Sequence, residues 1–116
     1  MNDATTNNQI DYIEIPVREI AGTKDFYGAV FGWKFKDYGS DYTSFFDGRL
    51  GGGFYLQTAP PAKGPLLVIY ATGLAVAHEK IKAAGGAIVK DTFSFPGGRR
   101  FHFTDPSGNE LAVWSE

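Results

Sequence analysis

The closing stretch FHFTDPSGNELAVWSE, residues 101–116, carries the clearest fold signal in the chain. It predicts a strand, a tight turn and a final strand, because DPSG places Asp, Pro and Gly where a type I turn prefers them. In the first strand, period-two alternation puts Phe101 and Phe103 on one face and His102 on the other. The same alternation groups three residues on one face of the last strand: Glu110, Ala112 and Trp114.

An alternating strand and an amphipathic helix open the chain. In IDYIEIPV, residues 10–17, the β-branched residues at 13, 15 and 17 alternate with others, which is typical of a half-buried strand with Tyr12 and Glu14 on its other face. The next segment, AGTKDFYGAVFG, changes to helical spacing. Its predicted buried stripe is Phe26, Ala29 and Val30, extended to Trp33, and Gly32 is the predicted left-handed end of the helix.

Three short strands complete the first half of the chain. They are predicted in WKFKDY, YTSFF and LGGGFYLQ, and Asp47-Gly48 is a hairpin signal between the second and third. Three successive glycines within a strand indicate a bulge, a bend or the close approach of another backbone. We expect a bend, because the glycines lie near the junction between two halves of the chain.

The second half repeats the element order of the first. After the proline-rich segment 58–65 come a strand in LLVIYA, a helix in GLAVAHEKIKAAGG, and strands in AIVKDT, RRFHFTD and NELAVWSE. The helix is predicted to bury Leu74, Ala77, Ile81 and Ala84 and to end at Gly85 or Gly86. The sequence therefore predicts an α+β fold of two βαβββ modules, residues 10–57 and 66–116, joined by a linker and preceded by a nine-residue tail.

Composition excludes several classes of partner. A net charge of −2 provides no basic field for nucleic acid, and the absence of cysteine excludes disulfides and thiolate ligands. No apolar stretch approaches membrane-spanning length, and the polar start MNDATTNNQ does not fit a signal peptide. We therefore expect a cytoplasmic protein that contacts neither nucleic acid nor membrane.

Four stretches together resemble the vicinal oxygen chelate superfamily, which includes glyoxalase I, bleomycin-resistance proteins and extradiol dioxygenases. They are IDYIEIPVREI, DFYGAVFGW, HEKIKAAGGAIV and FTDPSGNELAVW, and they span nearly the whole chain. The resemblance implies two βαβββ modules that form a U-shaped mixed sheet around a cavity. It also implies a homodimer.

The resemblance assigns metal-ligand positions in which this chain has no usual ligand. Counting along the shared motifs places Tyr12, Pro65 and Ala112 at three of them, and GGGFYLQ offers no carboxylate or imidazole for the fourth. We therefore expect no cofactor. A divalent metal held by the atypical set Glu14, His102 and Glu110 is the less favoured alternative. The other histidine, His78, is predicted to flank the packed face of its helix.

Without metal, the cavity is predicted to be an apolar, aromatic-lined pocket for a small molecule. The proposed wall is Tyr12, Glu14, Phe45, Leu67, Ile69, His102, Glu110 and Trp114. PGGRR, residues 96–100, is predicted to be a loop at its rim. The favoured function is binding of a partly apolar or aromatic ligand. The alternatives are an enzyme of the glyoxalase (lyase) or dioxygenase type, with an atypical metal site or with Glu14 and His102 in acid–base catalysis, and a structural or partner-binding dimer.

Overall fold

Two βαβββ modules make up the fold in the computed structural model, which describes residues 7–116. The first module contains β1 (Tyr12–Val17), α1 (Ile20–Phe31), β2 (Lys34–Asp37), β3 (Tyr42–Phe46) and β4 (Gly51–Leu56). The second contains β5 (Leu67–Tyr70), α2 (Leu74–Ala83), β6 (Ala87–Phe95), β7 (Gly98–Thr104) and β8 (Glu110–Ser115). The predicted α+β fold class and element order are confirmed. Residues 1–6 of the predicted tail lie outside the described residues.

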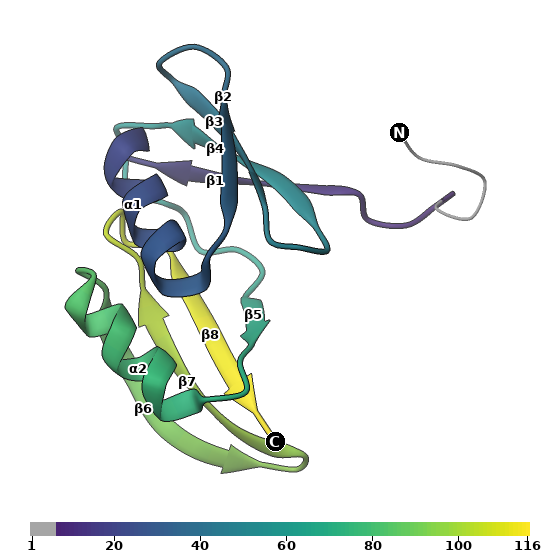
Figure 1. The fold of residues 1–116 in the computed structure, drawn as a ribbon, viewed down its shortest axis with the longest axis vertical. Helices are drawn as coiled ribbons and strands as arrows, with labels where there is room; N and C mark the ends of the chain where they lie inside the picture. Colours follow the sequence, from purple (N-terminus) through teal and green to yellow (C-terminus); the bar gives the residue numbers. More distant parts are fainter. Residues whose placement is uncertain (1–6) are drawn as a thin grey trace.

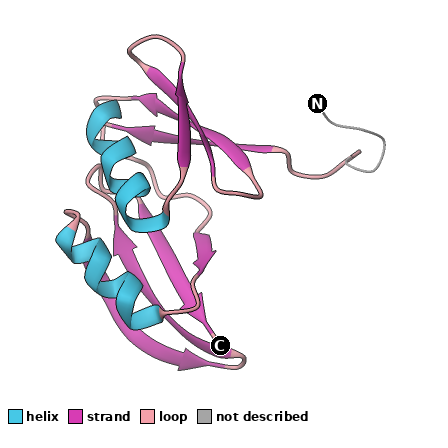
Figure 2. Cartoon of the chain, in the orientation of Figure 1, coloured by secondary structure: helices cyan, strands magenta, loops and turns pink. Residues whose placement is uncertain are grey.

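Each module forms a mixed four-stranded sheet with one helix on one face. The strand orders are β1-β4-β3-β2 and β5-β8-β7-β6, with the first pair parallel in each sheet and the others antiparallel. Both helices lie on the same side of the molecule (Figure 1), and no closed barrel forms among residues 7–116. Figure 2 shows that the opposite face of each sheet carries no helix. We call these two surfaces the open faces.

The helices end and pack largely as their sequences predict. Gly32 caps α1 in the left-handed region with φ 72°, and α2 buries Leu74, Ala77 and Ile81. The prediction for Ala29 was wrong, because this residue is exposed, whereas Tyr27, which the predicted stripe did not include, is fully buried. Tyr27 stacks on Trp33 and Phe54 with ring centroids 4.7 and 5.0 Å apart. The buried residues of α1 are Thr23, Phe26, Tyr27 and Val30, a stripe at helical spacing that leaves Ala29 outside it.

The glycines of β4 serve a purpose other than the predicted bend. Gly51, Gly52 and Gly53 pair in unbroken register with β1 and β3. A Cβ at Gly52 would overlap the carbonyl of Ile13 and the ring of Phe45, so glycine permits their close approach. Of the three alternatives, close approach is therefore the one that the structure supports.

The turn between β7 and β8 joins the two modules. The predicted turn is confirmed by the 2.9 Å bond from the Gly108 amide to the Asp105 carbonyl, and Ser107 lacks the positive φ that a type II turn requires. Tyr27 of α1 donates to Asp105 Oδ2 at 2.9 Å, and burial and the neighbouring carboxylate raise the pKa of Tyr27. Asn109 Nδ2 donates to the Pro16 carbonyl at 2.7 Å. These bonds hold the start of β8 against the end of β1.

Candidate functional site

A cavity of about 690 Å³ lies where the two modules meet. Its walls come from β1, the proline-rich linker, the end of β7 and the start of β8, so both modules contribute. The linker supplies five consecutive wall residues, 61–65, and Leu66 continues the wall towards β5. The remaining wall residues are Ile13, Glu14, Ile15, Pro16, Leu67, His102, Thr104, Gly108, Asn109, Glu110 and Leu111.

His102 and Glu110 form a hydrogen-bonded pair in this wall. Phe101 and Phe103 are fully buried in the core, so alternation turns His102 to the opposite, open face, as predicted. His102 Nδ1 lies 2.9 Å from Glu110 Oε2. An ionised carboxylate only accepts hydrogen bonds, so the proton of this bond is on Nδ1. His102 is only 8% exposed, and its Nε2 is buried without a hydrogen-bond partner among residues 7–116.

Glu14 is held by a network of two tyrosines on the open face of the first module. The Tyr42 hydroxyl donates to Glu14 Oε2 at 2.8 Å and lies 2.6 Å from the Tyr12 hydroxyl. Since the single Tyr42 proton goes to Glu14, Tyr12 donates to Tyr42. Burial, then these hydrogen bonds, raise the pKa of Tyr42 well above its ordinary value. Gly53 leaves room for this arrangement, because a Cβ there would overlap the Tyr42 hydroxyl.

The structure brings four of the eight predicted wall residues to the cavity: Glu14, Leu67, His102 and Glu110. Phe45 and Ile69 instead face the helices and belong to the hydrophobic core or pack against it. Tyr12 and Trp114 lie on the open faces, where Trp114 packs edge-on against Tyr70 at 5.0 Å, but neither lines the cavity. Strand alternation therefore assigned the face correctly for Tyr12 and Trp114 and could not say how far the cavity extends along it.

Tyr42, Lys63 and Asn109 are site residues that the sequence reasoning missed. Lys63 and Asn109 line the cavity, and Tyr42 orients Glu14. The signal for Tyr42 was present in the glycine triplet, because a glycine in a central strand leaves space above it for a large side chain from a neighbouring strand. Lys63 carries no such signal, since its position depends on the path of the linker.

The predicted rim loop in residues 96–100 is wrong. A tight turn at Pro96-Gly97 is followed at once by β7, so Arg99 and Arg100 are strand residues. The Arg100 guanidinium lies 5.3 Å from the Phe93 ring centre, and neither arginine lines the cavity. The positive φ of Gly97, 111°, allows the sharp reversal that the sequence reasoning had taken for a longer loop.

The residues at the implied metal positions do not fit a metal site. Pro65 and Ala112 have no donor atom in their side chains, and the Tyr12 hydroxyl is bonded to Tyr42. The part of the chain that the structure describes contains no group of three or more His, Asp or Glu side chains able to hold an ion. Glu14, His102 and Glu110 line one cavity but do not converge as a ligand set.

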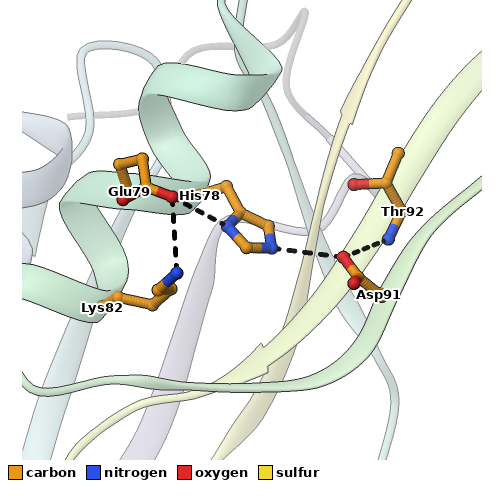
Figure 3. Close-up of polar contacts among 5 residues, drawn as sticks. All are labelled: His78, Glu79, Lys82, Asp91 and Thr92. Carbon is orange, nitrogen blue, oxygen red and sulfur yellow. Dashed lines mark hydrogen bonds and ion pairs between the residues drawn. The ribbon is translucent and has the colours of Figure 1, made fainter.

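His78 lies apart from the cavity, beside the packed face of α2. Figure 3 shows its ring between Glu79, 3.8 Å from Nδ1, and Asp91 of β6, 3.3 Å from Nε2. The hydrogen bond from the Thr92 amide is the main cause that lowers the pKa of Asp91, and the hydrogen bond with His78 is the second. The ring also packs edge-on against Phe101. His78 therefore connects α2 to β6 and supports the fold.

The chain resembles solved structures over most of its length. It matches a glyoxalase-related enzyme from Fulvimarina pelagi with a TM-score of 0.81 and 19% identity, covering 94% of this chain and 88% of that one. A glyoxalase/bleomycin resistance protein/dioxygenase family enzyme from Burkholderia phytofirmans gives a TM-score of 0.79 and 18% identity, covering 91% of this chain and 98% of that one. The third is a mutant of the fosfomycin resistance protein FosX from Listeria monocytogenes, solved with Mn(II) and 1S,2S-dihydroxypropylphosphonic acid. It gives a TM-score of 0.81 and 17% identity, covering 93% of this chain and 90% of that one. At these identities the likeness shows a shared fold.

A search of curated proteins finds no match. Neither α1 nor α2 is long and apolar enough to cross a membrane, and no other helix occurs in residues 7–116. A family model matches residues 9–113, which is nearly the whole described chain. The two-module fold, the cavity at the junction and this match lead to one conclusion: the chain belongs to the Glyoxalase/Bleomycin resistance protein/Dioxygenase superfamily.

Proposed function

We propose that this chain binds a partly apolar small molecule in the cavity between its modules, without the metal that its superfamily resemblance implies. The observation that carries the proposal is the composition of the wall. Aliphatic residues such as Leu66, Leu67 and Leu111 surround a few polar groups, chiefly Glu14, His102 and Glu110. Pockets of this size and character bind drug-sized molecules, with the polar groups fixing orientation. Sequestration of a drug or metabolite is one form of this function.

A ligand screen with a blocked cavity tests the proposal. Ligands that bind the folded protein raise its melting temperature by mass action. Ala62→Trp places a large ring in the cavity wall from an exposed linker position, and Ala59→Trp makes the same change outside the wall. We expect aromatic metabolites or drugs to stabilise the wild type and Ala59→Trp but not Ala62→Trp. Equal stabilisation of both variants, or no stabilising compound, would contradict binding in this cavity.

Metal analysis tests the second part of the proposal. Protein purified without chelators is expected to contain no stoichiometric Zn²⁺, Ni²⁺, Fe²⁺ or Mn²⁺ and to show no tight binding on titration. The reason is that two of the implied ligand positions, Pro65 and Ala112, have no donor. Stoichiometric metal that is lost in Glu14→Ala and Glu110→Ala would show that the atypical set holds an ion.

Acid–base catalysis is the second candidate function, and the His102–Glu110 pair favours it. Glu110 holds the proton on Nδ1, which leaves the lone pair of Nε2 free to accept a proton. This differs from the predicted pairing of His102 with Glu14, because Glu14 bonds to Tyr42. A panel of carbonyl compounds in D₂O would reveal deuterium incorporation next to the carbonyl. Exchange that His102→Asn does not reduce would contradict this role.

A homodimer would cover the open faces. Four large hydrophobic residues on these faces are 44–50% exposed: Tyr12, Phe46, Val68 and Tyr70. Apolar surface of this kind is typical of association surfaces, and dimers are what the superfamily resemblance implies. Sedimentation equilibrium is expected to give twice the 12.6 kDa chain mass. Val68→Lys is expected to shift the protein towards the monomer. A wild-type monomer at high micromolar concentration would contradict this proposal.

A further inference from the structure

The polar groups of the cavity are biased towards hydrogen-bond acceptors. Glu14 and Glu110 are carboxylates contributed by different modules, and both line the cavity. Neither forms an ion pair with a lysine or arginine anywhere in residues 7–116. Each is instead bonded to one side-chain donor, the Tyr42 hydroxyl for Glu14 and the His102 ring for Glu110. The cavity therefore contains two carboxylates that have no ion-pair partner among the lysines and arginines of the described chain.

The proton positions add a third acceptor and remove donors. The His102 proton on Nδ1 is directed at Glu110, and the buried Nε2 has no hydrogen-bond partner in residues 7–116, so this nitrogen offers a ligand a third acceptor. The Tyr42 and Tyr12 protons are used within their network, as argued above. Asn109 Nδ2 already donates to the Pro16 carbonyl and to Asp105. Among the side chains of the wall, Thr104 and Lys63 remain as donors, and Lys63 lies on the exposed linker.

A buried acceptor without a partner is costly, so a ligand that supplies N–H groups stabilises this cavity more than one that supplies acceptors. The unneutralised carboxylates add a preference for positive charge. The aliphatic part of the wall requires an apolar body on the same ligand. A bare metal ion would balance the negative charge but would not contact the aliphatic part of the wall. The described chain also has no group of three His, Asp or Glu side chains that could hold such an ion.

We infer that the cavity selects an organic cation: a protonated amine with an apolar or aromatic body, whose N–H groups are donated to acceptors among Glu14, Glu110 and His102 Nε2. This inference rests on the proposed binding function and names its ligand class. In this cation site, the first module contributes the side chains of Glu14 and Tyr42, and the second module contributes those of His102 and Glu110.

Matched ligand series separate this inference from the proposed function. Each series keeps one apolar body, phenyl, naphthyl or indolyl, and changes only the end group of a two-carbon chain: ammonium, hydroxyl or carboxylate. Binding is measured by calorimetry at pH 7 and low salt. The amine of the best series is expected to bind about tenfold tighter than its alcohol, the gain typical of hydrogen bonds to charged groups. The carboxylate is expected to bind most weakly.

Two variants locate the interaction. Glu14→Gln and Glu110→Gln remove a charge and keep the shape, and each is expected to weaken the amine about tenfold while leaving the alcohol nearly unchanged. Glu79→Gln, on α2 and outside the cavity wall, is the matched control and is expected to change neither. Unliganded melting temperatures confirm that each variant folds. The ranking of end groups on the wild-type protein tests the inference even where a variant does not fold.

The outcomes are distinguishable. An amine that binds no tighter than its alcohol, or a carboxylate that binds tightest, overturns the inference and leaves the binding function standing. Amine selectivity that both glutamine variants retain also overturns it. No binding by any member of the three series counts against the inference and, together with a negative wider screen, against the proposed function. Loss of amine affinity with added salt, while the alcohol is unaffected, would support the charge-based selection.

Discussion

The two modules share an element order but fill their cores differently. In the first, rings pack on rings: Tyr27 stacks on Trp33 and Phe54, and Phe45 packs against the same two rings, at centroid distances of 4.7–5.0 Å. In the second, the helix presents the smaller side chains Leu74, Ala77 and Ile81 to the sheet. The same fold therefore forms around two different sets of contacts. What the modules share is the spacing of buried positions and of turns.

The open faces differ in a way that matters for function. The first carries the Tyr12–Tyr42–Glu14 network and the glycines beneath it. The second carries His102 with Glu110, and the aromatic residues around Trp114. Because the cavity lies between the faces, each module contributes one oriented carboxylate. The site is thus a property of the junction, and neither half contains it alone.

The largest expected effect comes from the ring core of the first module. Phe54 is fully buried and contacts several rings, so Phe54→Ala is expected to lower the free energy of unfolding by about 3–5 kcal/mol. Urea denaturation measures the change. Ile81→Ala in the second module is the matched comparison and is expected to cost about 2–5 kcal/mol. A loss below 1 kcal/mol for Phe54→Ala would contradict the ring-packed core.

A smaller effect is expected from the glycine strand. Gly52→Ala forces a methyl group against the Ile13 carbonyl and the Phe45 ring, and overpacking of this kind costs about 1–3 kcal/mol. Gly51→Ala is the control, since its nearest contact, the Phe45 carbonyl oxygen, would lie at an ordinary 3.7 Å. Thermal denaturation of the pair tests the close-approach role. Equal losses at both positions would indicate a general backbone effect instead.

The hydrogen bond between Tyr27 of the first module and Asp105 of the second is expected to contribute less to the free energy of unfolding. Tyr27→Phe removes the donor to the buried Asp105, at an expected cost of about 1–2 kcal/mol. Chemical denaturation gives the value, and Tyr38→Phe, at an exposed tyrosine, is the control. If this hydrogen bond couples the two modules, Tyr27→Phe also makes their unfolding less cooperative. An unchanged stability would show that the bond between Tyr27 and Asp105 does not stabilise the fold.

The smallest effect is a change in pH dependence. The raised pKa of Tyr27 means that, above about pH 10, the unfolded chain loses this proton before the folded chain does. The stabilisation is therefore fully present below pH 10 and decreases as the pH rises further. Stability measured from pH 8 to 11 is expected to fall less steeply for Tyr27→Phe than for the wild type. An identical slope would contradict the shifted pKa.

The sequence alone was sufficient to predict the two modules, the helix end at Gly32, the type I turn and the orientation of His102. These features depend on local spacing and turn chemistry, which a short stretch carries within itself. The same local reasoning failed at Ala29 and Tyr27, because Phe26 and Val30 fit helical stripes through either residue, and only the packing of Tyr27 on Trp33 and Phe54 decides between them.

Only the tertiary structure decided which residues meet at the cavity. Glu110 rather than Glu14 pairs with His102, Tyr42 orients Glu14, and Phe45 and Ile69 pack into or against the core. Each of these outcomes depends on how one strand lies against a distant one and on the path of the linker. A one-dimensional pattern specifies the face of a strand, but the partners across that face are set by the packing of both modules together.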